Sequence, residues 1–132
     1  MKFLLDTNTC IDFVRGAEKV VERMSREPPE DCGISTVTAY ELFCVVLKCK
    51  KPDVERRKVG ILLRTVHLLE FDEDAAKVSA QIRHDLEAAG KPIGPYDLLL
   101  AGQALSRDFT LVTSNTGEFS RVVGLRLVNW RI

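Results

Sequence analysis

Short apolar segments alternate along the chain with longer stretches in which apolar residues recur at helical spacing. Phe3-Leu4-Leu5 is the first apolar segment, and its length and composition are typical of a buried strand. Val78, Ile82 and Leu86 follow one another at four-residue spacing, as on one face of a helix. This pattern predicts strands at 3–5, 32–34, 66–71 and 110–113, with a candidate fifth strand at 125–128.

Capping residues and prolines mark the ends of the predicted helices. Ser35 or Thr36 is expected to cap a helix that continues to about Lys48, and Asp72 to cap a long helix that Gly90 ends. Further helices are predicted from about residue 9, over 17–26, from Pro52, and from Gly94-Pro95. Strands that alternate with helices favour an α/β fold with a parallel sheet covered on both faces.

Three acidic residues each stand alone in apolar surroundings. Asp6 directly follows the first apolar segment, Glu41 is the only charged residue within 34–47, and Asp97 is the only one within 92–106. A carboxylate buried without a partner costs several kcal/mol or shifts its pKa until it is neutral. Either distant basic groups pair with these carboxylates, or the carboxylates meet around a cation.

The predicted sheet gives these side chains a common place. In open parallel sheets, sites form beyond the carboxyl ends of the strands. Asp6 falls at one such end and residues 113–115 (Thr-Ser-Asn) at another, while Glu41 and Asp97 lie near the starts of helices. Oxygen-bearing side chains at one crevice suit Mg²⁺ or Mn²⁺. Such an ion can activate water and neutralise charge on a phosphodiester during hydrolysis.

Each carboxylate also has a structural explanation. Asp6 could cap the helix that follows it, and Asp97 in the first turn of a helix could favour the helix dipole. Thr38 stands three residues before Glu41, which is the spacing of a capping box. The three residues taken together favour a cation site more strongly than any one of them does.

Composition and charge restrict the function without choosing it. A chain of 132 residues with 45% hydrophobic and 29% charged residues fits one soluble globular domain. Nineteen basic residues balance nineteen acidic ones, so contact with a nucleic acid would need a local basic patch. The basic stretch 48–58 is predicted to be a solvated corner between helices, and the alternative is a phosphate-contacting rim beside the acidic crevice.

The cysteines and the N-terminus favour a cytoplasmic protein. The four cysteines show no C-x-x-C spacing, so we expect reduced, mostly buried thiols and no zinc site. The apolar run at the N-terminus is too short for a signal peptide or a membrane span. No membrane association is therefore expected.

Four separated segments carry a resemblance to a known family. They read FLLDTNTCIDFVRG, ISTVTAYEL, GKPIGPYDLLLAGQA and LVTSNTGEFSRVVGLRLVNW, in this order. The chain resembles the PIN-domain ribonucleases, and most of all the VapC-type toxins of bacterial type II toxin–antitoxin pairs. The resemblance covers residues 1–132 as a single PIN domain. It implies a three-layer α/β/α fold around a mainly parallel sheet of four to five strands, and a metal-dependent endoribonuclease activity with Mg²⁺, or alternatively Mn²⁺.

The resemblance also implies roles for the acidic residues. Asp6, Glu41 and Asp97 match the catalytic acidic core, in which Asp6 and Asp97 would be the principal metal ligands and Glu41 would bind metal or orient the attacking water. The family often has a fourth acidic residue after the penultimate strand. This chain has Asn115 there, with Glu118 three residues further on, so both are expected to be weak metal ligands.

Further expectations concern substrate and partners. Asn8 and Thr113 are expected to position metal-bound water or phosphate. The resemblance implies a homodimer, a cognate antitoxin that blocks the acidic site, and a structured RNA substrate such as tRNA, with the anticodon loop of initiator tRNA as a suggestion.

Two other functions remain open from the sequence. A haloacid-dehalogenase-like phosphatase would use Asp6 as its nucleophile, but Asn8 stands where its acid–base aspartate is usual. A catalytically silent module that only binds RNA or protein would not need the three acidic residues.

Overall fold

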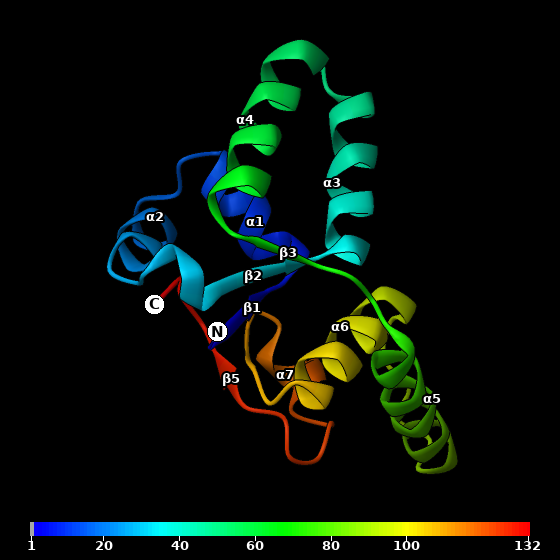
Figure 1. The fold of residues 1–132 in the computed structure, drawn as a ribbon. Coiled ribbons are helices and arrows are strands. Elements are labelled where there is room, and N and C mark those ends of the chain that lie inside the picture. The colour runs from blue at the N-terminus through cyan, green and yellow to red at the C-terminus, as the bar shows by residue number, and fades with distance from the viewer. Residues whose placement is uncertain (1) are drawn as a thin grey trace.

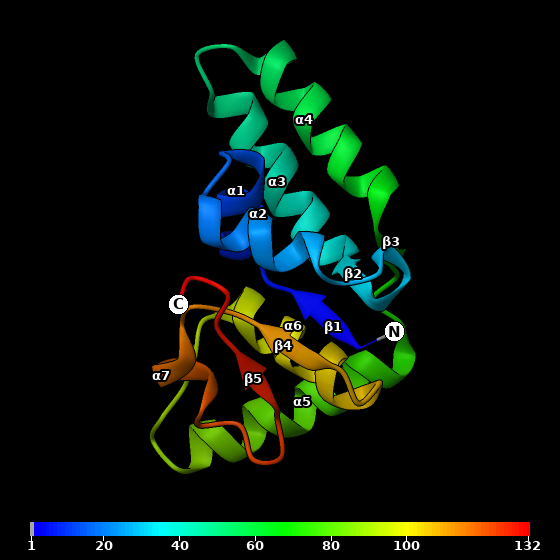
Figure 2. The same cartoon turned by 90° about the vertical axis from the view of Figure 1, so that its left-hand side faces the viewer.

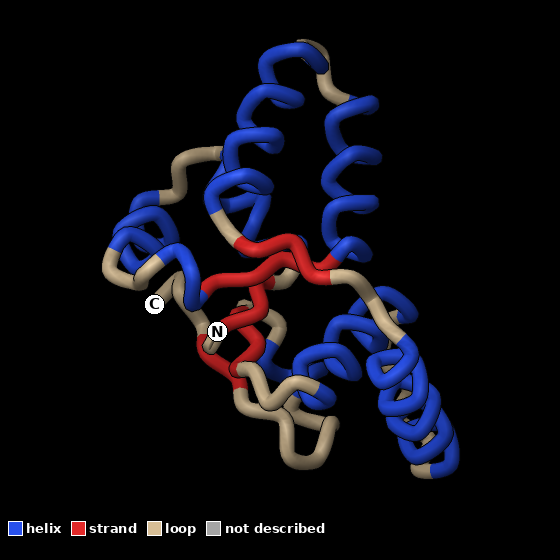
Figure 3. Tube along the Cα trace, in the orientation of Figure 1, coloured by secondary structure: helices blue, strands red, loops and turns tan. Residues whose placement is uncertain are grey.

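The structure, a computed structural model, describes residues 2–132, and within them five parallel strands form one sheet in the order β3-β2-β1-β4-β5 (Figures 1 and 3). The strands are β1 (Phe3–Leu5), β2 (Cys32–Ser35), β3 (His67–Leu69), β4 (Thr110–Val112) and β5 (Leu127–Val128). The helices are α1 (Thr7–Val14), α2 (Glu18–Ser25), α3 (Thr36–Lys48), α4 (Pro52–Thr65), α5 (Glu73–Ala88), α6 (Pro95–Ser106) and α7 (Thr116–Phe119), and a 3₁₀ turn covers Pro29–Asp31. The predicted parallel α/β sheet is confirmed.

Helices cover both faces of this sheet, so the fold has three layers (Figure 2). Successive side chains of a strand point to opposite faces, and β1 and β4 follow this rule. Leu5 and Val112 pack in a core with residues of α1 to α4, whereas Leu4 and Leu111 pack in a second core with residues of α5 to α7. The central strand β1 thus contributes to both cores, and its carboxyl end carries Asp6.

Helices α5 and α6 pack closely because of a glycine at their contact. A Cβ atom at Gly102 would lie 1.8 Å from the Ser79 Oγ and 2.8 Å from the Ser79 Cα, which no real packing allows. Only a residue without a side chain fits at this position. The close contact fixes α6, whose first turn carries Asp97.

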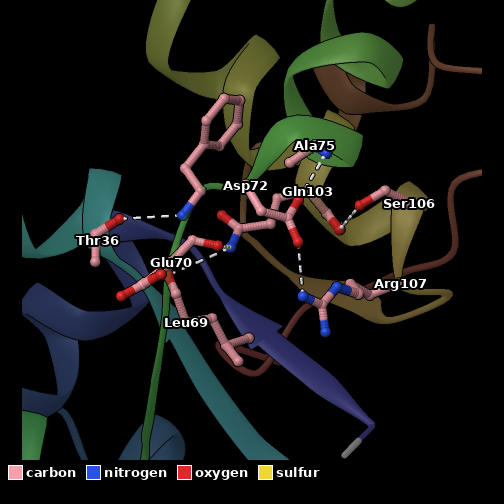
Figure 4. A network of polar contacts seen from close by, with 9 residues as sticks. Thr36, Leu69, Glu70, Asp72, Ala75, Gln103, Ser106 and Arg107 are labelled. Carbon is pink, nitrogen blue, oxygen red and sulfur yellow. Dashed lines mark hydrogen bonds and ion pairs between the residues drawn. The ribbon is translucent and has the colours of Figure 1, made fainter.

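A polar network ties the loop after β3 to α6 (Figure 4). The Gln103 Nε2 donates to the Glu70 carbonyl oxygen at 3.1 Å. Asp72 caps α5 by accepting from the Ala75 N–H, and it also pairs with the Arg107 Nη2 at 2.7 Å. These two interactions lower the pKa of Asp72 below its usual value. The network joins the N-terminal end of α5 to the C-terminal part of α6.

Several element boundaries differ from the prediction. The first helix begins at Thr7 instead of about residue 9, because the Asp6 side chain accepts from the Thr9 N–H and so caps it. The third strand is shorter than 66–71, since the Phe71 N–H donates to the Thr36 hydroxyl instead of to a strand. The fifth strand is likewise limited to two residues. Helix α7 was not predicted, because one turn is too short to show a periodic pattern.

The cysteines and the helices bear on two further expectations. All four cysteines are free thiols; Cys10 and Cys32 are buried, whereas Cys44 and Cys49 are half-buried. Burial raises the pKa of Cys32 to about 11. Over residues 2–132, no helix combines the length and the apolar character that crossing a membrane requires.

Candidate active site

Asp6 lies at the carboxyl end of the central strand and is only 3% exposed. Its Oδ1 accepts from the Thr9 N–H at 2.8 Å, which makes Asp6 the N-cap of α1. The capping role proposed from the sequence is therefore real. The cap uses only one oxygen of the carboxylate. Asp6 also lines a crevice at this sheet edge, so a second role is compatible with the cap.

Glu41 is held by a side chain that the sequence did not single out. The Thr7 hydroxyl donates to the Glu41 Oε1 at 2.6 Å, and its oxygen lies 3.2 Å from the Thr38 hydroxyl oxygen. The capping-box explanation of Glu41 is wrong, because Ser35 caps α3 and Thr38 lies buried inside that helix. Thr7 directly follows Asp6 in the motif, which was the one local signal that could have identified it.

Asp97 lies in the first turn of α6, and other carboxylates perturb it. Its pKa is raised from 3.8 to about 6, first by burial and then by the negative charges of Glu118, Asp6 and Glu41. A Cβ atom at Gly94 would lie 3.7 Å from both the Asp97 Oδ2 and the Glu118 Oε1. Three other acidic side chains therefore act on Asp97 at the carboxyl edge of the sheet.

Glu118 is anchored beside Asp97 by two donors. Its Oε1 accepts from the Gly94 N–H at 2.6 Å, and its Oε2 accepts from the Asn115 Nδ2 at 2.9 Å. These hydrogen bonds, that from Asn115 first, lower the pKa of Glu118 below its usual value. The Asn115 amide, at the position where the family often has an acid, thus binds the neighbouring Glu118 carboxylate and keeps it ionised.

One crevice brings the predicted acidic residues together between α1, α3 and α6. Asp6, Glu41 and Asp97 line it, and so does the exposed Asn8. Thr113 does not, because it is fully buried and its hydroxyl accepts from the Asn115 N–H at 2.9 Å. Thr113 was expected to position metal-bound water or phosphate, but its burial leaves it without access to the crevice. The crevice also contains residues that the sequence did not single out as site residues, namely Thr7, Ile11, Tyr40, Cys44, Val45, Lys48 and Tyr96.

The donor set of the crevice fits a hard cation. None of Asp6, Glu41 and Asp97 forms an ion pair with a Lys or Arg of residues 2–132, so pairing with distant basic groups is not observed there. The pKa of Asp97 is raised by burial first and then by the neighbouring negative charges, and hydrogen bonding with Asn115 offsets this only in part. In the described part of the chain, no three His, Cys, Asp or Glu side chains are already spaced to hold one ion. The carboxylates would have to close around it.

The basic stretch mostly forms the exposed corner between α3 and α4. Lys48 alone lines the acidic crevice, whereas Lys50 and Lys51 line a separate groove between α1, α3 and α4. Arg56 and Lys58 pair with acidic residues of their own helix. The interpretation as a solvated corner therefore describes most of the stretch, and Lys48 is the one residue placed to act as a phosphate-contacting rim.

A family model and several relatives match this chain. The model described as "PIN domain" matches residues 3–125. The chain therefore belongs to the PIN-domain family, as the resemblance implied. PIN domains are nucleases, and PIN-domain nucleases generally need a divalent metal ion. Membership of this family removes the haloacid-dehalogenase-like phosphatase as an alternative.

Within the family, the relatives are VapC ribonucleases. The chain is 37% identical over 131 residues to the tRNA(fMet)-specific endonuclease VapC of Salmonella typhimurium, with 98% of each chain covered. It is 31% identical over 134 residues to ribonuclease VapC2 of Rickettsia felis, again with 98% of each covered. The crystal structure of DNA-bound VapBC from Salmonella typhimurium matches the fold with a TM-score of 0.93 at 37% identity and 98% coverage of both chains. VapBC2 from Rickettsia felis, bound to a DNA fragment from the promoter, gives 0.92 at 30% identity, with 98% of this chain and 99% of that one covered.

Proposed function

We propose that this chain is a metal-dependent endoribonuclease toxin that hydrolyses an RNA phosphodiester with water activated by Mg²⁺, for which Mn²⁺ can substitute. The observation that supports this most is the convergence of Asp6, Glu41 and Asp97 on one crevice, where none of them forms an ion pair with a basic side chain of residues 2–132. Carboxylate oxygens are the ligands that these ions prefer. Residues 1–132 would form a single PIN domain.

The acidic residues would divide the work at this crevice. Asp6 and Asp97 would hold the cation, which supplies a Lewis acid and lowers the pKa of a bound water. Glu41 would bind the cation or orient the attacking water, and the Thr7 hydroxyl fixes the carboxylate for either task. Asn8, exposed at the rim, would position phosphate or a metal-bound water.

The fourth corner of the site would contribute weakly. Glu118 and Asn115 would be weak metal ligands, because their side chains are already hydrogen-bonded to each other. Thr113 would act one step further away by orienting the Asn115 backbone. The negative charge of Glu118 would still favour a cation near Asp97, because its effect on the pKa of Asp97 shows that the two carboxylates interact.

We propose tRNA as the substrate, with the anticodon loop of initiator tRNA as the specific target. The relatives from Salmonella typhimurium and Shigella flexneri are named as tRNA(fMet)-specific endonucleases, at 37% and 38% identity over nearly the whole chain. A tRNA substrate would place the activity in the cytoplasm. Cleavage of total RNA followed by sequencing of the new 5′ ends would identify the bond.

A cognate antitoxin is the proposed regulatory partner. The solved relatives from Salmonella typhimurium and Rickettsia felis are VapBC assemblies. The apolar groove between α1, α3 and α4 shares Ile11 and Val45 with the acidic crevice, so a peptide segment in this groove would reach the carboxylates. We expect the product of a small adjacent reading frame to suppress cleavage, and an adjacent product without effect would contradict this assignment.

The homodimer is a proposal of the same kind. Light scattering after size-exclusion chromatography would test it, with twice the chain mass of 14.8 kDa expected. A mass of one chain at micromolar concentration would contradict it.

Cleavage assays on matched variants would test the proposed activity. Asp6→Asn and Asp97→Asn retain the shape of the side chain and remove its charge, so cleavage should fall by about 10²-fold or more if the carboxylates hold the metal. Asp74→Asn is the matched control, because Asp74 is an exposed aspartate in the first turn of α5. Full activity of Asp97→Asn would refute the assignment. Binding of RNA without cleavage by the wild type would instead support the catalytically silent module.

A further inference from the structure

Two tyrosines lie next to each other at the rim of the acidic crevice, with their rings tilted against each other. Tyr40 of α3 is 53% exposed and Tyr96 of α6 is 42% exposed, and their ring centroids lie 5.8 Å apart at an interplanar angle of 51°. Both residues line the crevice that contains the carboxylates. Neither belongs to either hydrophobic core, so packing of the fold does not account for them.

The chain connects each ring to a carboxylate. Tyr40 immediately precedes Glu41, and Tyr96 immediately precedes Asp97. Neighbouring Cα atoms are about 3.8 Å apart, so each ring is fixed within one residue of a proposed catalytic group. Because both rings and both carboxylates line the same crevice, a group that binds on the rings is held beside the proposed catalytic residues.

The surroundings favour a nucleic acid over an apolar partner. A tyrosine phenol is neutral at physiological pH, so neither exposed ring repels phosphate. Lys48 lies in the same crevice and forms no ion pair with an acidic side chain of residues 2–132. Aromatic faces for bases and a cation for phosphates are the two elements that bind single-stranded RNA.

We propose that Tyr40 and Tyr96 form a stacking platform for one unpaired nucleobase next to the scissile phosphodiester, with Lys48 contacting a neighbouring phosphate. This inference rests on the ribonuclease activity proposed above and adds a base-binding subsite to it. The base stacks on an exposed ring face and not between the two rings, because insertion would need about 6.8 Å, twice the 3.4 Å stacking rise, and the centroids are only 5.8 Å apart and the rings are tilted. The platform thus selects RNA in which a base near the cut is unstacked, as in a loop.

The test combines tyrosine variants with abasic substrates. The substrate is the shortest RNA stem-loop that the wild type cleaves, together with a series that carries one abasic ribose at each position around the cut. Single-turnover cleavage gives the half-saturating enzyme concentration and the maximal rate. Fluorescence anisotropy, with Asp97→Asn as the non-cleaving background, gives RNA affinity independently of catalysis. Tyr40→Phe and Tyr96→Phe retain the rings, and Phe43→Ala removes an equally exposed ring of α3 that does not line the crevice.

The platform predicts a loss in binding that the conservative variants restore. Tyr40→Ala and Tyr96→Ala should weaken RNA affinity by about 5- to 150-fold with a smaller effect on the maximal rate, whereas both Phe variants and Phe43→Ala should resemble the wild type. One abasic position should weaken binding to the wild type by a similar factor and cause no further loss in the alanine variants.

Two other results would overturn the platform. The first is an RNA affinity that Tyr40→Ala and Tyr96→Ala leave unchanged while cleavage still depends on Asp97. This result would overturn the platform even if the two variants changed the binding of a protein partner. The second is a loss of RNA affinity in the alanine variants that adds to the loss caused by an abasic ribose, whichever position is abasic. Cleavage that does not depend on Asp97 would overturn the proposed ribonuclease site itself, and is thereby distinguished from failure of the platform.

Discussion

Replacing Asp97 by Asn should stabilise the metal-free protein at neutral pH while it removes a proposed metal ligand. The pKa of Asp97 is raised from 3.8 to about 6 by burial and by three neighbouring carboxylates. An acid whose pKa rises on folding destabilises the folded state wherever it is ionised. This penalty is complete above pH 6 and absent below pH 3.8, so the gain from Asp97→Asn should appear only as the pH rises through this window.

The magnitude follows from the size of the shift and the exposure of the group. A shift of about two pKa units corresponds to about 3 kcal/mol as an upper limit. Asp97 is only half-buried, so solvent screening reduces the gain to on the order of 1 kcal/mol. The loss of the favourable helix-dipole interaction, about 0.3–1 kcal/mol, works in the opposite direction. The net expectation is a rise in Tm of a few degrees, about 4 °C at most.

Thermal and urea denaturation between pH 4 and pH 8 in the presence of a chelator would measure this effect. The stability difference between Asp97→Asn and the wild type should vanish toward pH 4. Added Mg²⁺ should reduce it at pH 8, because the ion stabilises the wild type through binding to the folded state. The exposed-site control Asp74→Asn should stay within about 0.5 kcal/mol at every pH. A variant that is less stable than the wild type at pH 8, or equally shifted at pH 4 and pH 8, would refute the proposed cluster of like charges.

Three further predictions address residues around the site and in the fold. Glu118→Gln should weaken Mg²⁺ affinity in calorimetry by about 10-fold, the low end for outer ligands; unchanged affinity would make Glu118 a structural anchor only. Thr7→Val removes the 2.6 Å hydrogen bond to Glu41, so the maximal cleavage rate should fall about 10-fold with unchanged RNA affinity, and a full rate would show that Glu41 needs no positioning. Gly102→Ala would place a methyl group against Ser79 and should lower the free energy of unfolding by about 1–3 kcal/mol or more; an unchanged urea midpoint would contradict the close helix contact.

Local sequence signals accounted for the order of the elements and the edge of the sheet that carries the site. The strand Phe3–Leu5, the cap at Ser35 and the start of α6 at Pro95 all depend on residues within a few positions of one another. Because parallel strands end at a common edge, the meeting of Asp6 with the other carboxylates could be anticipated from this order alone.

Contacts between distant residues could not be predicted in the same way. The hydrogen bond between Thr7 and Glu41 spans 34 residues, and that between Gly94 and Glu118 spans 24. Nothing in the local pattern of either segment marks the other as its partner. The position of Tyr40 could not be predicted for a different reason. An aromatic residue inside an apolar stretch is expected in the core, and only the orientation of α3 places Tyr40 at the rim of the crevice.

Metal add-back to the purified chain would test the central claim most directly. Wild type and Asp97→Asn are freed of metal by exhaustive chelation, and cleavage of end-labelled tRNA is followed while Mg²⁺ is titrated. We expect no cleavage by either protein without metal, saturable recovery at a single bond for the wild type, and little recovery for Asp97→Asn over the same range. Cleavage by the wild type that persists without a divalent ion, or equal recovery by both proteins, would contradict a metal-dependent site built on Asp6, Glu41 and Asp97.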